Sequence, residues 1–201
     1  MEKKQIVVFG GCFNPPLNSH FSLAQQLVNE YDIIEKLIFI PVSCKYQKTG
    51  LLSNEHRYNM LKLVCNRNEQ FDVSRIEIDS TIQPNTVETL RKIQMQYPNN
   101  EIAFIIGSDN LKEIETWKKA DELVKDFKIY VFERARDIVE EIINSSKFLK
   151  EHENNFIKAK NNITSNLSST FVRGKIKEGK SIRYLLPDEV IEYIRKNELY
   201  K

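Results

Sequence analysis

The chain has 201 residues, of which 41% are hydrophobic and 29% are charged, as is ordinary for a globular protein and unlike a disordered tail or a coiled coil. Its 30 basic and 28 acidic residues leave a formal net charge of only +2. That balance excludes a large basic field for non-specific nucleic-acid binding, but it leaves room for a local anion site.

Cysteine and histidine spacing offers no disulfide framework and no metal site. Cys12, Cys44 and Cys65 are odd in number and have no CxxC spacing, and the three histidines form no HxxxH pair. The apolar stretch at 6–10 is too short for a signal peptide, and no run approaches the roughly 18 apolar residues of a membrane span. We therefore expect a cytoplasmic protein that acts on neither membrane nor nucleic acid.

Runs of β-branched and aromatic residues alternate with segments of helical periodicity along the chain. Such uninterrupted apolar runs are typical of strands buried on both faces of a parallel sheet. The expected strands are 6–9, 37–40, 71–76, 102–106, 129–132 and 156–158, and the expected helices are 21–31, 54–66, 86–97, 120–124, 168–178 and 188–196. This alternation predicts an α/β fold with a doubly wound, open parallel sheet.

Three further expectations concern other parts of the chain. Residues 145–166 are rich in Asn, Lys and Ser, so apart from the short strand we expect loops there. Residues 167–201 are too few for an independent core, and we expect them to form a small C-terminal helical part of one domain spanning 1–201. Met60 and Met95 are expected in the core.

The sharpest candidate site follows the first expected strand, where residues 10–20 read GGCFNPPLNSH. Ligands of open α/β sheets bind where the carboxyl ends of strands meet the N-termini of helices. The two glycines allow the backbone to approach a phosphate, and His20 falls in the first turn of the next helix. The segment is neither GxGxxG nor a Walker A loop, and taken alone it is as consistent with an ordinary turn as with a ligand site.

Five later segments, taken in their order along the chain, favour the ligand site over the ordinary turn. They are YQKTGL at 46–51 with HR at 56–57, TVETL at 86–90, IIGSDNL at 105–111 followed by Trp117, LSSTFVR at 167–173, and LLP at 185–187. Together with the glycine turn, they resemble the nucleotidyltransferase family whose first motif is GGxFxPxHxGH. Within that family they resemble the nicotinate/nicotinamide mononucleotide adenylyltransferases, over nearly the whole chain.

The resemblance implies a Rossmann-like fold and a reaction in NAD biosynthesis. ATP would give its adenylyl group to nicotinate mononucleotide, and nicotinamide mononucleotide is a second acceptor that stays open. The partners implied are therefore small molecules, and a homo-oligomer stays open too. Mg²⁺ is expected to arrive on the triphosphate, so no protein metal ligand is expected.

The resemblance also assigns roles to the residues at the matched positions. His20 and Arg173 would be catalytic, His20 by donating to the α-phosphate and Arg173 by binding the outer phosphates. The expected ATP-binding residues are Gly10, Gly11, Phe13, Asn14, Asn18, His20, Gly107, Asp109, Ser169, Thr170 and Arg173. The expected mononucleotide-binding residues are Cys12, Lys48, Thr86 and Trp117.

Several of these residues have an ordinary structural interpretation as well. Histidine often packs in a core, serines often cap helices, and a lysine in a polar loop is usually solvated. The residues for which this alternative stays open are His20, Lys48, Thr86, Asp109, Trp117, Ser169, Thr170 and Arg173.

The sequence departs from the family pattern at four positions. Leu17 stands where the first motif has histidine or threonine, and losing such a donor can cost about 10²–10³ in rate. Ser19 replaces the motif's glycine, Asn14 replaces the aspartate of many bacterial members, and Asn85 stands where many of them have an aromatic residue. The other matched positions favour an active enzyme.

Two competing functions stay open at this point. One is a non-catalytic module that senses ATP or dinucleotides, for which Leu17 is the main support. The other is a phosphopantetheine adenylyltransferase or a cytidylyltransferase of the same superfamily, against which Trp117 and the loop at 46–51 argue. The preference for nicotinate or nicotinamide is not fixed, because backbone groups that bind a carboxylate leave no side-chain signature.

Overall fold

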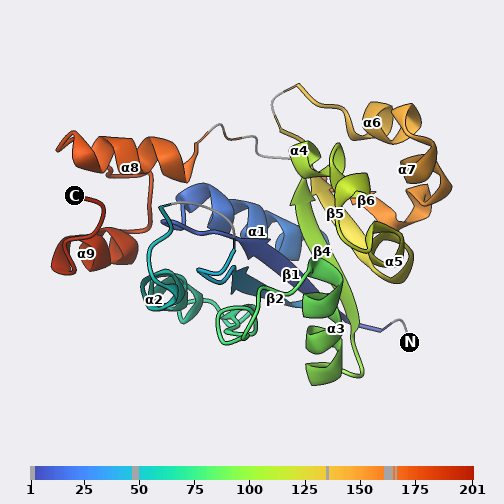
Figure 1. The fold of residues 1–201 in the computed structure, drawn as a ribbon, viewed down its shortest axis with the longest axis horizontal. Helices are drawn as coiled ribbons and strands as arrows, with labels where there is room; N and C mark the ends of the chain where they lie inside the picture. The colour runs from blue at the N-terminus through green and yellow to red at the C-terminus, as the bar shows by residue number, and fades with distance from the viewer. Residues whose placement is uncertain (1–2, 47–49, 135, 161–164, 166) are drawn as a thin grey trace.

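The part of the chain that the structure describes forms one open sheet of parallel strands, in the order β3-β2-β1-β4-β5-β6 (Figure 1). The structure is a computed structural model, and it describes residues 3–46, 50–134, 136–160, 165 and 167–201. The strands are β1 Gln5–Gly11, β2 Ile34–Pro41, β3 Phe71–Val73, β4 Glu101–Gly107, β5 Lys128–Phe132 and β6 Phe156–Lys158. The doubly wound open sheet predicted from the sequence is confirmed.

Helices connect the strands and follow the last of them. They are α1 Asn18–Glu30, α2 Asn54–Cys65, α3 Thr86–Gln96, α4 Ser108–Leu111, α5 Ala120–Asp126, α6 Val139–Ser145, α7 Lys147–Glu151, α8 Ser169–Lys177 and α9 Asp188–Lys196. Two single 3₁₀ turns, Ile114–Thr116 and Glu153–Asn155, precede α5 and β6. Figure 1 shows α5–α7 at one end of the molecule and α8 and α9 at the other.

Three sequence expectations are wrong. The expected loops at 145–166 include helix α7, because Ser146 caps it by accepting from the Leu149 amide and Leu149 packs into the core. The third strand ends at Val73 instead of continuing to Ile76. Met95 is 74% exposed on α3, whereas Met60 on α2 is fully buried as expected.

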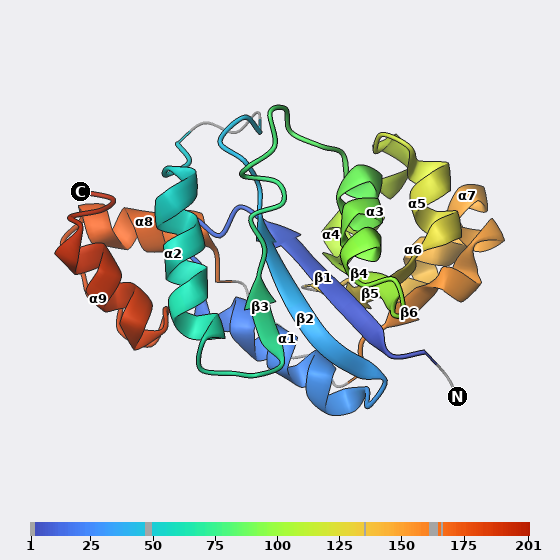
Figure 2. The same ribbon diagram turned by 90° about the horizontal axis from the view of Figure 1, so that it is seen from below.

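Successive side chains of the central strands point into two separate apolar cores. Ile6 and Val8 of β1 pack with α3, α5, α6 and α7, while Val7 between them packs with α1 and α2. This period of two places helices on both faces of the sheet, and it explains why the strands have uninterrupted apolar sequences. Figure 2 shows the two helical layers on either side of the sheet.

A third apolar cluster joins the C-terminal helices to the rest of the chain. Leu17, immediately before α1, is 1% exposed and belongs to a cluster with Met60 of α2, Val172 of α8 and Ile191 of α9. Helix α2 lies between β3 and α9 (Figure 2). The leucine in the first motif is therefore a packing residue that holds α8 and α9 next to the first turn.

Shortening Leu17 tests this packing role. We expect Leu17→Ala to lower the free energy of unfolding by about 2–5 kcal/mol, because the side chain is fully buried and leaves a cavity. Leu17→His should also destabilise, because the imidazole would be buried in an apolar cluster. Urea denaturation measures both.

The matched control is Leu63→Ala on α2, where the side chain is 39% exposed. That variant should change stability within about 0.5 kcal/mol. Equal stabilities of the Leu17→Ala and Leu63→Ala variants would contradict the packing role.

Candidate active site

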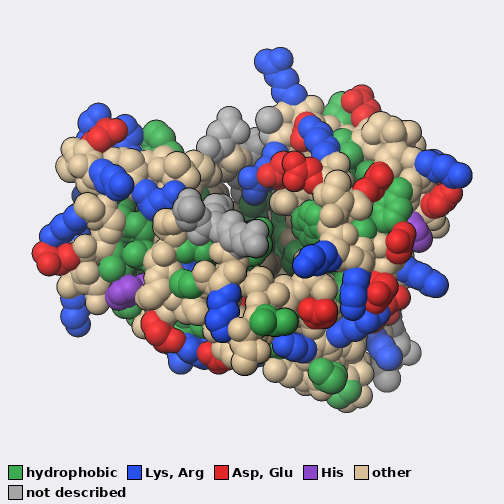
Figure 3. Space-filling view, viewed as in Figure 1, with side chains coloured by type: hydrophobic (Ala, Val, Ile, Leu, Met, Phe, Trp, Pro, Cys, Tyr) green, Lys and Arg blue, Asp and Glu red, His purple; other side chains and the backbone are tan. Residues whose placement is uncertain are grey.

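The candidate site lies where β1 and β4 end side by side and their following helices turn to opposite faces of the sheet. This is the topological switch point, the usual ligand crevice of open α/β sheets. Gly10 and Gly11 close β1, and Gly107 closes β4. Figure 3 shows the surface hollowed between the side of the C-terminal helices and the side of α4–α7, with charged side chains of both signs near the rim.

The glycine turn after β1 is shaped by the ring of Phe13. A Cβ on Gly11 would stand 3.1 Å from that ring, so the turn leaves no space for a side chain there. Phe13 itself has φ 44°, a left-handed conformation that is costly for a bulky residue and that occurs mainly at functional sites. Its ring is 3% exposed and stacks edge-on against His20, with 5.1 Å between ring centroids. Phe13 thus packs beneath His20.

His20 lies in the first turn of α1, and its protonation state follows from its contacts. The Leu17 amide donates to Nδ1 over 2.9 Å, so the neutral ring carries its proton on Nε2. The pKa of His20 is lowered to about 4, first because burial disfavours the charged ring and second because Arg134 places a positive charge nearby. At neutral pH, His20 is therefore an uncharged donor through Nε2.

The end of β4 carries an ion pair between Asp109 and Arg134, with 3.3 Å between Oδ1 and Nε. A Cβ on Gly107 would stand 2.6 Å from that Nε, so the pair lies directly over the glycine. Buried Ser108 accepts from the Arg134 amide over 2.9 Å and donates to Asp137. This network fixes the segment after β5 relative to β4.

Helix α8 brings its first turn onto the glycine turn. Ser168 caps α8 by accepting from the Phe171 amide, and Ser169 Oγ donates to the Pro15 carbonyl over 2.8 Å. Arg173 donates to the Asn14 carbonyl over 2.9 Å and to Thr170 Oγ1 over 3.1 Å. Two of the expected phosphate-binding residues of α8, Ser169 and Arg173, therefore contact the first motif directly, and Thr170 is bonded to Arg173.

Asn14 and Asn18 tie the glycine turn to other segments. The Asn14 amide nitrogen donates to the Gly50 carbonyl over 2.9 Å, and its Oδ1 accepts from Tyr200. The Asn18 amide donates to the Leu185 carbonyl over 3.0 Å, and its side chain is bonded to the Tyr184 carbonyl. Both expected ATP-binding residues therefore also hold the turn in shape.

On the mononucleotide side, Thr86 and Trp117 come from neighbouring segments. Thr86 is the first residue of α3, whose N-cap is Asn85, so the alternative of Thr86 as the cap is wrong. Trp117 is half-buried and packs edge-on against Phe104 of β4, with 6.4 Å between centroids. Lys119 and Glu88, which follow these two residues, form an ion pair of 3.7 Å.

Of the two other residues expected on this side, only Cys12 can be placed. It is half-exposed in the glycine turn. Lys48 lies outside the described residues.

Sequence reasoning gave no role to two arginines that the structure places around this site. Arg134 comes two residues after β5, so the rule that sites form at the carboxyl ends of strands would have indicated it. Arg57 is completely buried and donates to the carbonyls of Cys12, Val42 and Leu52 over 3.0, 2.5 and 3.0 Å. Those long-range contacts leave no sequence signal.

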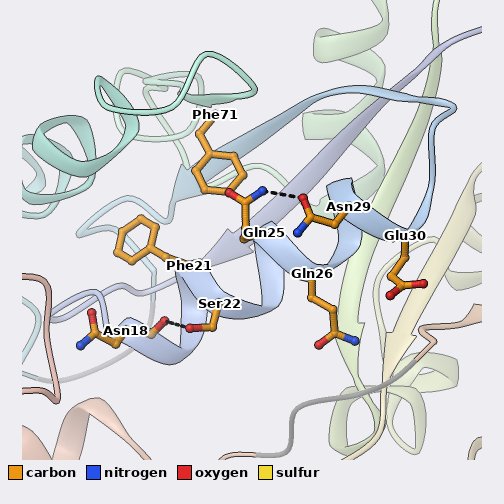
Figure 4. A pocket seen from close by; sticks show the side chains of 8 residues that line it. All are labelled: Asn18, Phe21, Ser22, Gln25, Gln26, Asn29, Glu30 and Phe71. Atoms are coloured by element: carbon orange, nitrogen blue, oxygen red, sulfur yellow. Dashed lines mark hydrogen bonds between the residues drawn. The ribbon is translucent and has the colours of Figure 1, made fainter.

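A different hollow, of about 540 Å³, lies on the outer face of α1 and takes in Phe71 (Figure 4). Of the expected site residues that the structure describes, only Asn18 lines it, and Gln25 there is already bonded to Asn29 over 2.8 Å. None of the described lysines and arginines lines it, so this hollow is unsuited to a triphosphate.

The described residues contain no group of three or more His, Cys, Asp or Glu side chains able to hold a metal ion. No helix among them is long and apolar enough to cross a membrane.

Comparison with known proteins gives consistent matches. The model of the cytidylyltransferase-like family matches residues 8–175. Probable nicotinate-nucleotide adenylyltransferases of Carboxydothermus hydrogenoformans and Clostridium tetani are 33% and 32% identical, each over 100% of both chains. The one from Caldicellulosiruptor bescii is 34% identical over 98% of this chain and 99% of its own.

Solved structures resemble this fold over almost its full length. The Plasmodium falciparum nicotinic acid mononucleotide adenylyltransferase complexed with NaAD gives a TM-score of 0.78 at 21% identity, covering 98% of this chain and 97% of that one. A putative nicotinate-nucleotide adenylyltransferase of Vibrio parahaemolyticus gives 0.65 at 21% identity, with 98% and 95% covered. At such identities the likeness concerns the fold.

The charge state of His20 can be measured directly. We expect ¹⁵N NMR to find its ring neutral at pH 6, with the proton on Nε2, and to see protonation only near pH 4. The unfolded chain takes up this proton near pH 6.5, so the His20 contribution lowers stability as the pH falls from about 6.5 to about 4.

Two variants complete this measurement. His20→Gln identifies the resonance. Arg134→Met should raise the pKa of His20, because it removes the nearby positive charge, yet leave it below 6.5, because burial is the larger cause. A charged His20 ring in the wild-type protein at pH 6 would contradict the assignment.

Proposed function

The chain belongs to the cytidylyltransferase-like family and, within it, to the nicotinate-nucleotide adenylyltransferases, and from this premise we propose how its site transfers an adenylyl group from ATP to nicotinate mononucleotide. The products are the dinucleotide and pyrophosphate, in NAD biosynthesis. The observation that carries the proposal is the neutral His20, held by the Leu17 amide near Arg134. The cytoplasmic location expected from the sequence is part of the same proposal.

The reaction needs positioned charges and no protein nucleophile. An oxygen of the mononucleotide phosphate attacks the α-phosphorus in line, and the bond from that phosphorus to the α,β-bridging oxygen breaks. The released electron pair stays on pyrophosphate. We assign to His20 Nε2 a hydrogen bond to an α-phosphate oxygen, where negative charge is stabilised in the transition state.

Fixed positive groups surround the expected path of the triphosphate. Arg173 and the free N–H groups at the start of α8 would bind the β- and γ-phosphates, with Ser169 and Thr170 in the same turn. Asp109, after β4, would accept from ribose hydroxyls. Arg134 adds a second guanidinium close enough to His20 to lower the pKa of its ring, and it would attract a phosphate.

We assign roles to the other expected nucleotide-binding residues from their positions in the fold. Gly10, Gly11 and Gly107 would let backbone approach the substrates, and the buried ring of Phe13 would support His20. Asn14 and Asn18 would keep the turn in its binding shape.

The pyridine side of the site rests on fewer contacts. The exposed side of the Trp117 ring would stack on the pyridine, with Thr86 as a hydrogen-bond donor. Cys12, in the glycine turn, and Lys48 complete the mononucleotide set that the family resemblance implies.

The enzymes of this family act with a divalent metal and ATP, and we propose Mg²⁺ as that ion. We propose that it enters bound to the triphosphate and water. It then belongs to the substrate, MgATP.

The non-catalytic alternative loses its main support. It rested on Leu17, whose burial among Met60, Val172 and Ile191 accounts for the leucine by packing. Acceptance of nicotinamide mononucleotide beside the acid remains part of the proposal, since both share the phosphate and ribose contacts.

Pyrophosphate release from MgATP is the deciding measurement. We expect release with nicotinate mononucleotide, and the ratio of kcat/KM values for the acid and the amide gives the preference. Phosphopantetheine and a phosphoalcohol with CTP serve as negative acceptors. Silence with both pyridine mononucleotides, in protein that ATP still stabilises thermally, would refute the transferase and restore the binding module.

Removing the imidazole tests its catalytic role. We expect His20→Ala to lower kcat at least about a hundredfold, because a donor to the transition state is lost, with ATP affinity largely retained. Calorimetry with ATP gives the affinity. His152→Ala, after α7, is the matched control and should keep wild-type turnover. Near-normal turnover of His20→Ala would remove His20 from the mechanism.

A further inference from the structure

The last residues of the chain leave α9 through two left-handed positions. The Glu198 amide donates to the Arg195 carbonyl over 3.2 Å and the Leu199 amide to the Ile194 carbonyl over 3.1 Å, which is a Schellman ending. Glu198 takes φ 54° where glycine is usual, and Tyr200 takes φ 66°. Each such non-glycine conformation costs about 1–2 kcal/mol, so the surrounding contacts must enforce it.

These two left-handed positions bring Tyr200 into contact with the first motif. Tyr200 donates its hydroxyl to Asn14 Oδ1 over 2.8 Å, across 186 positions of sequence. Oδ1 also accepts from the Leu52 amide over 3.3 Å, so both donors fix the carboxamide plane. The backbone carbonyl of the same Asn14 receives Arg173.

We propose that Tyr200 is a positioning residue for adenylyl transfer: its hydroxyl orients Asn14, and Asn14 in turn holds Arg173 where the outer phosphates of ATP bind. This inference rests on the proposed function. It places the end of the chain in the machinery of the active site.

The hydroxyl is not needed to anchor the tail. Leu199 is 8% exposed and packs in the third apolar cluster with Leu17 and Ile194, which holds the tail in place without it. Removing only the oxygen of Tyr200 therefore leaves the tail docked and removes the shorter of the two hydrogen bonds that Asn14 Oδ1 accepts. The effect should fall on ATP and spare the mononucleotide.

The test compares Tyr200→Phe with Tyr193→Phe. Tyr193, on the same helical part, bonds through its hydroxyl to His56 Nδ1 over 3.0 Å and to Asn59, away from the site. We expect Tyr200→Phe to lower kcat/KM for MgATP about three- to tenfold, the range for one lost hydrogen bond, with KM for the mononucleotide unchanged. Tyr193→Phe should keep the wild-type kcat/KM for MgATP and the wild-type KM for the mononucleotide, although it loses about as much thermal stability as Tyr200→Phe.

A double-mutant cycle shows whether the effect runs through Asn14. In the Asn14→Ala background, Tyr200→Phe should cause no further loss of kcat/KM, because its acceptor is gone. Equal kcat/KM for Tyr200→Phe and wild type, or a full additional loss in the Asn14→Ala background, would overturn the proposal.

The outcome can be separated from that of the proposed function. If the wild-type protein releases no pyrophosphate, the transferase assignment fails. The positioning role is then decided by ATP affinity in calorimetry, where Tyr200→Phe should bind about three- to tenfold more weakly than wild type and Tyr193→Phe should not. Equal ATP affinities of the three proteins would overturn it.

Discussion

The turn after β1 depends on hydrogen bonds from the far end of the chain. The Pro15 carbonyl receives Ser169, the Asn14 carbonyl receives Arg173, and the Asn14 side chain receives Tyr200, across 154, 159 and 186 positions. Buried carbonyls and amides that lack partners are costly, so this turn keeps its shape only while the C-terminal helices are docked. The first motif and the first turn of α8 are therefore one structural unit.

A second constraint is the charge at the centre of the site. A protonated His20 would face the positive charge of Arg134 in a buried place, so the ring stays neutral. In the proposed mechanism, the guanidinium groups would attract phosphate and the imidazole would donate one directed hydrogen bond. Because the Leu17 amide already occupies Nδ1, the donor can only be Nε2. Such a donor does not titrate near neutral pH, which suits a reaction that needs no proton shuttle.

The sequence predicts local features of this molecule better than long-range ones. The central strands are evident because each must be apolar on both faces, and His20 follows from its place after the first strand. Helix α7 was missed because its apolar face is short, only Leu149 being buried on it. The roles of Arg57 and Tyr200 depend on partners up to 45 and 186 positions away respectively, and no pattern of neighbouring residues encodes such contacts.

Leu17 connects these points. In the first motif, a polar residue at its position would offer a donor to phosphate, whereas leucine cannot. The structure gives the position a different use, since burying Leu17 against α8 and α9 stabilises the docking that carries Arg173 to the glycine turn. In the proposed mechanism, transition-state stabilisation would then fall on His20 and the arginines, which makes their placement more critical. Leucine at position 17 thus removes a hydrogen-bond donor to phosphate and at the same time adds an apolar contact to the C-terminal helices. Its net effect on the reaction rate depends on how firmly those helices are held.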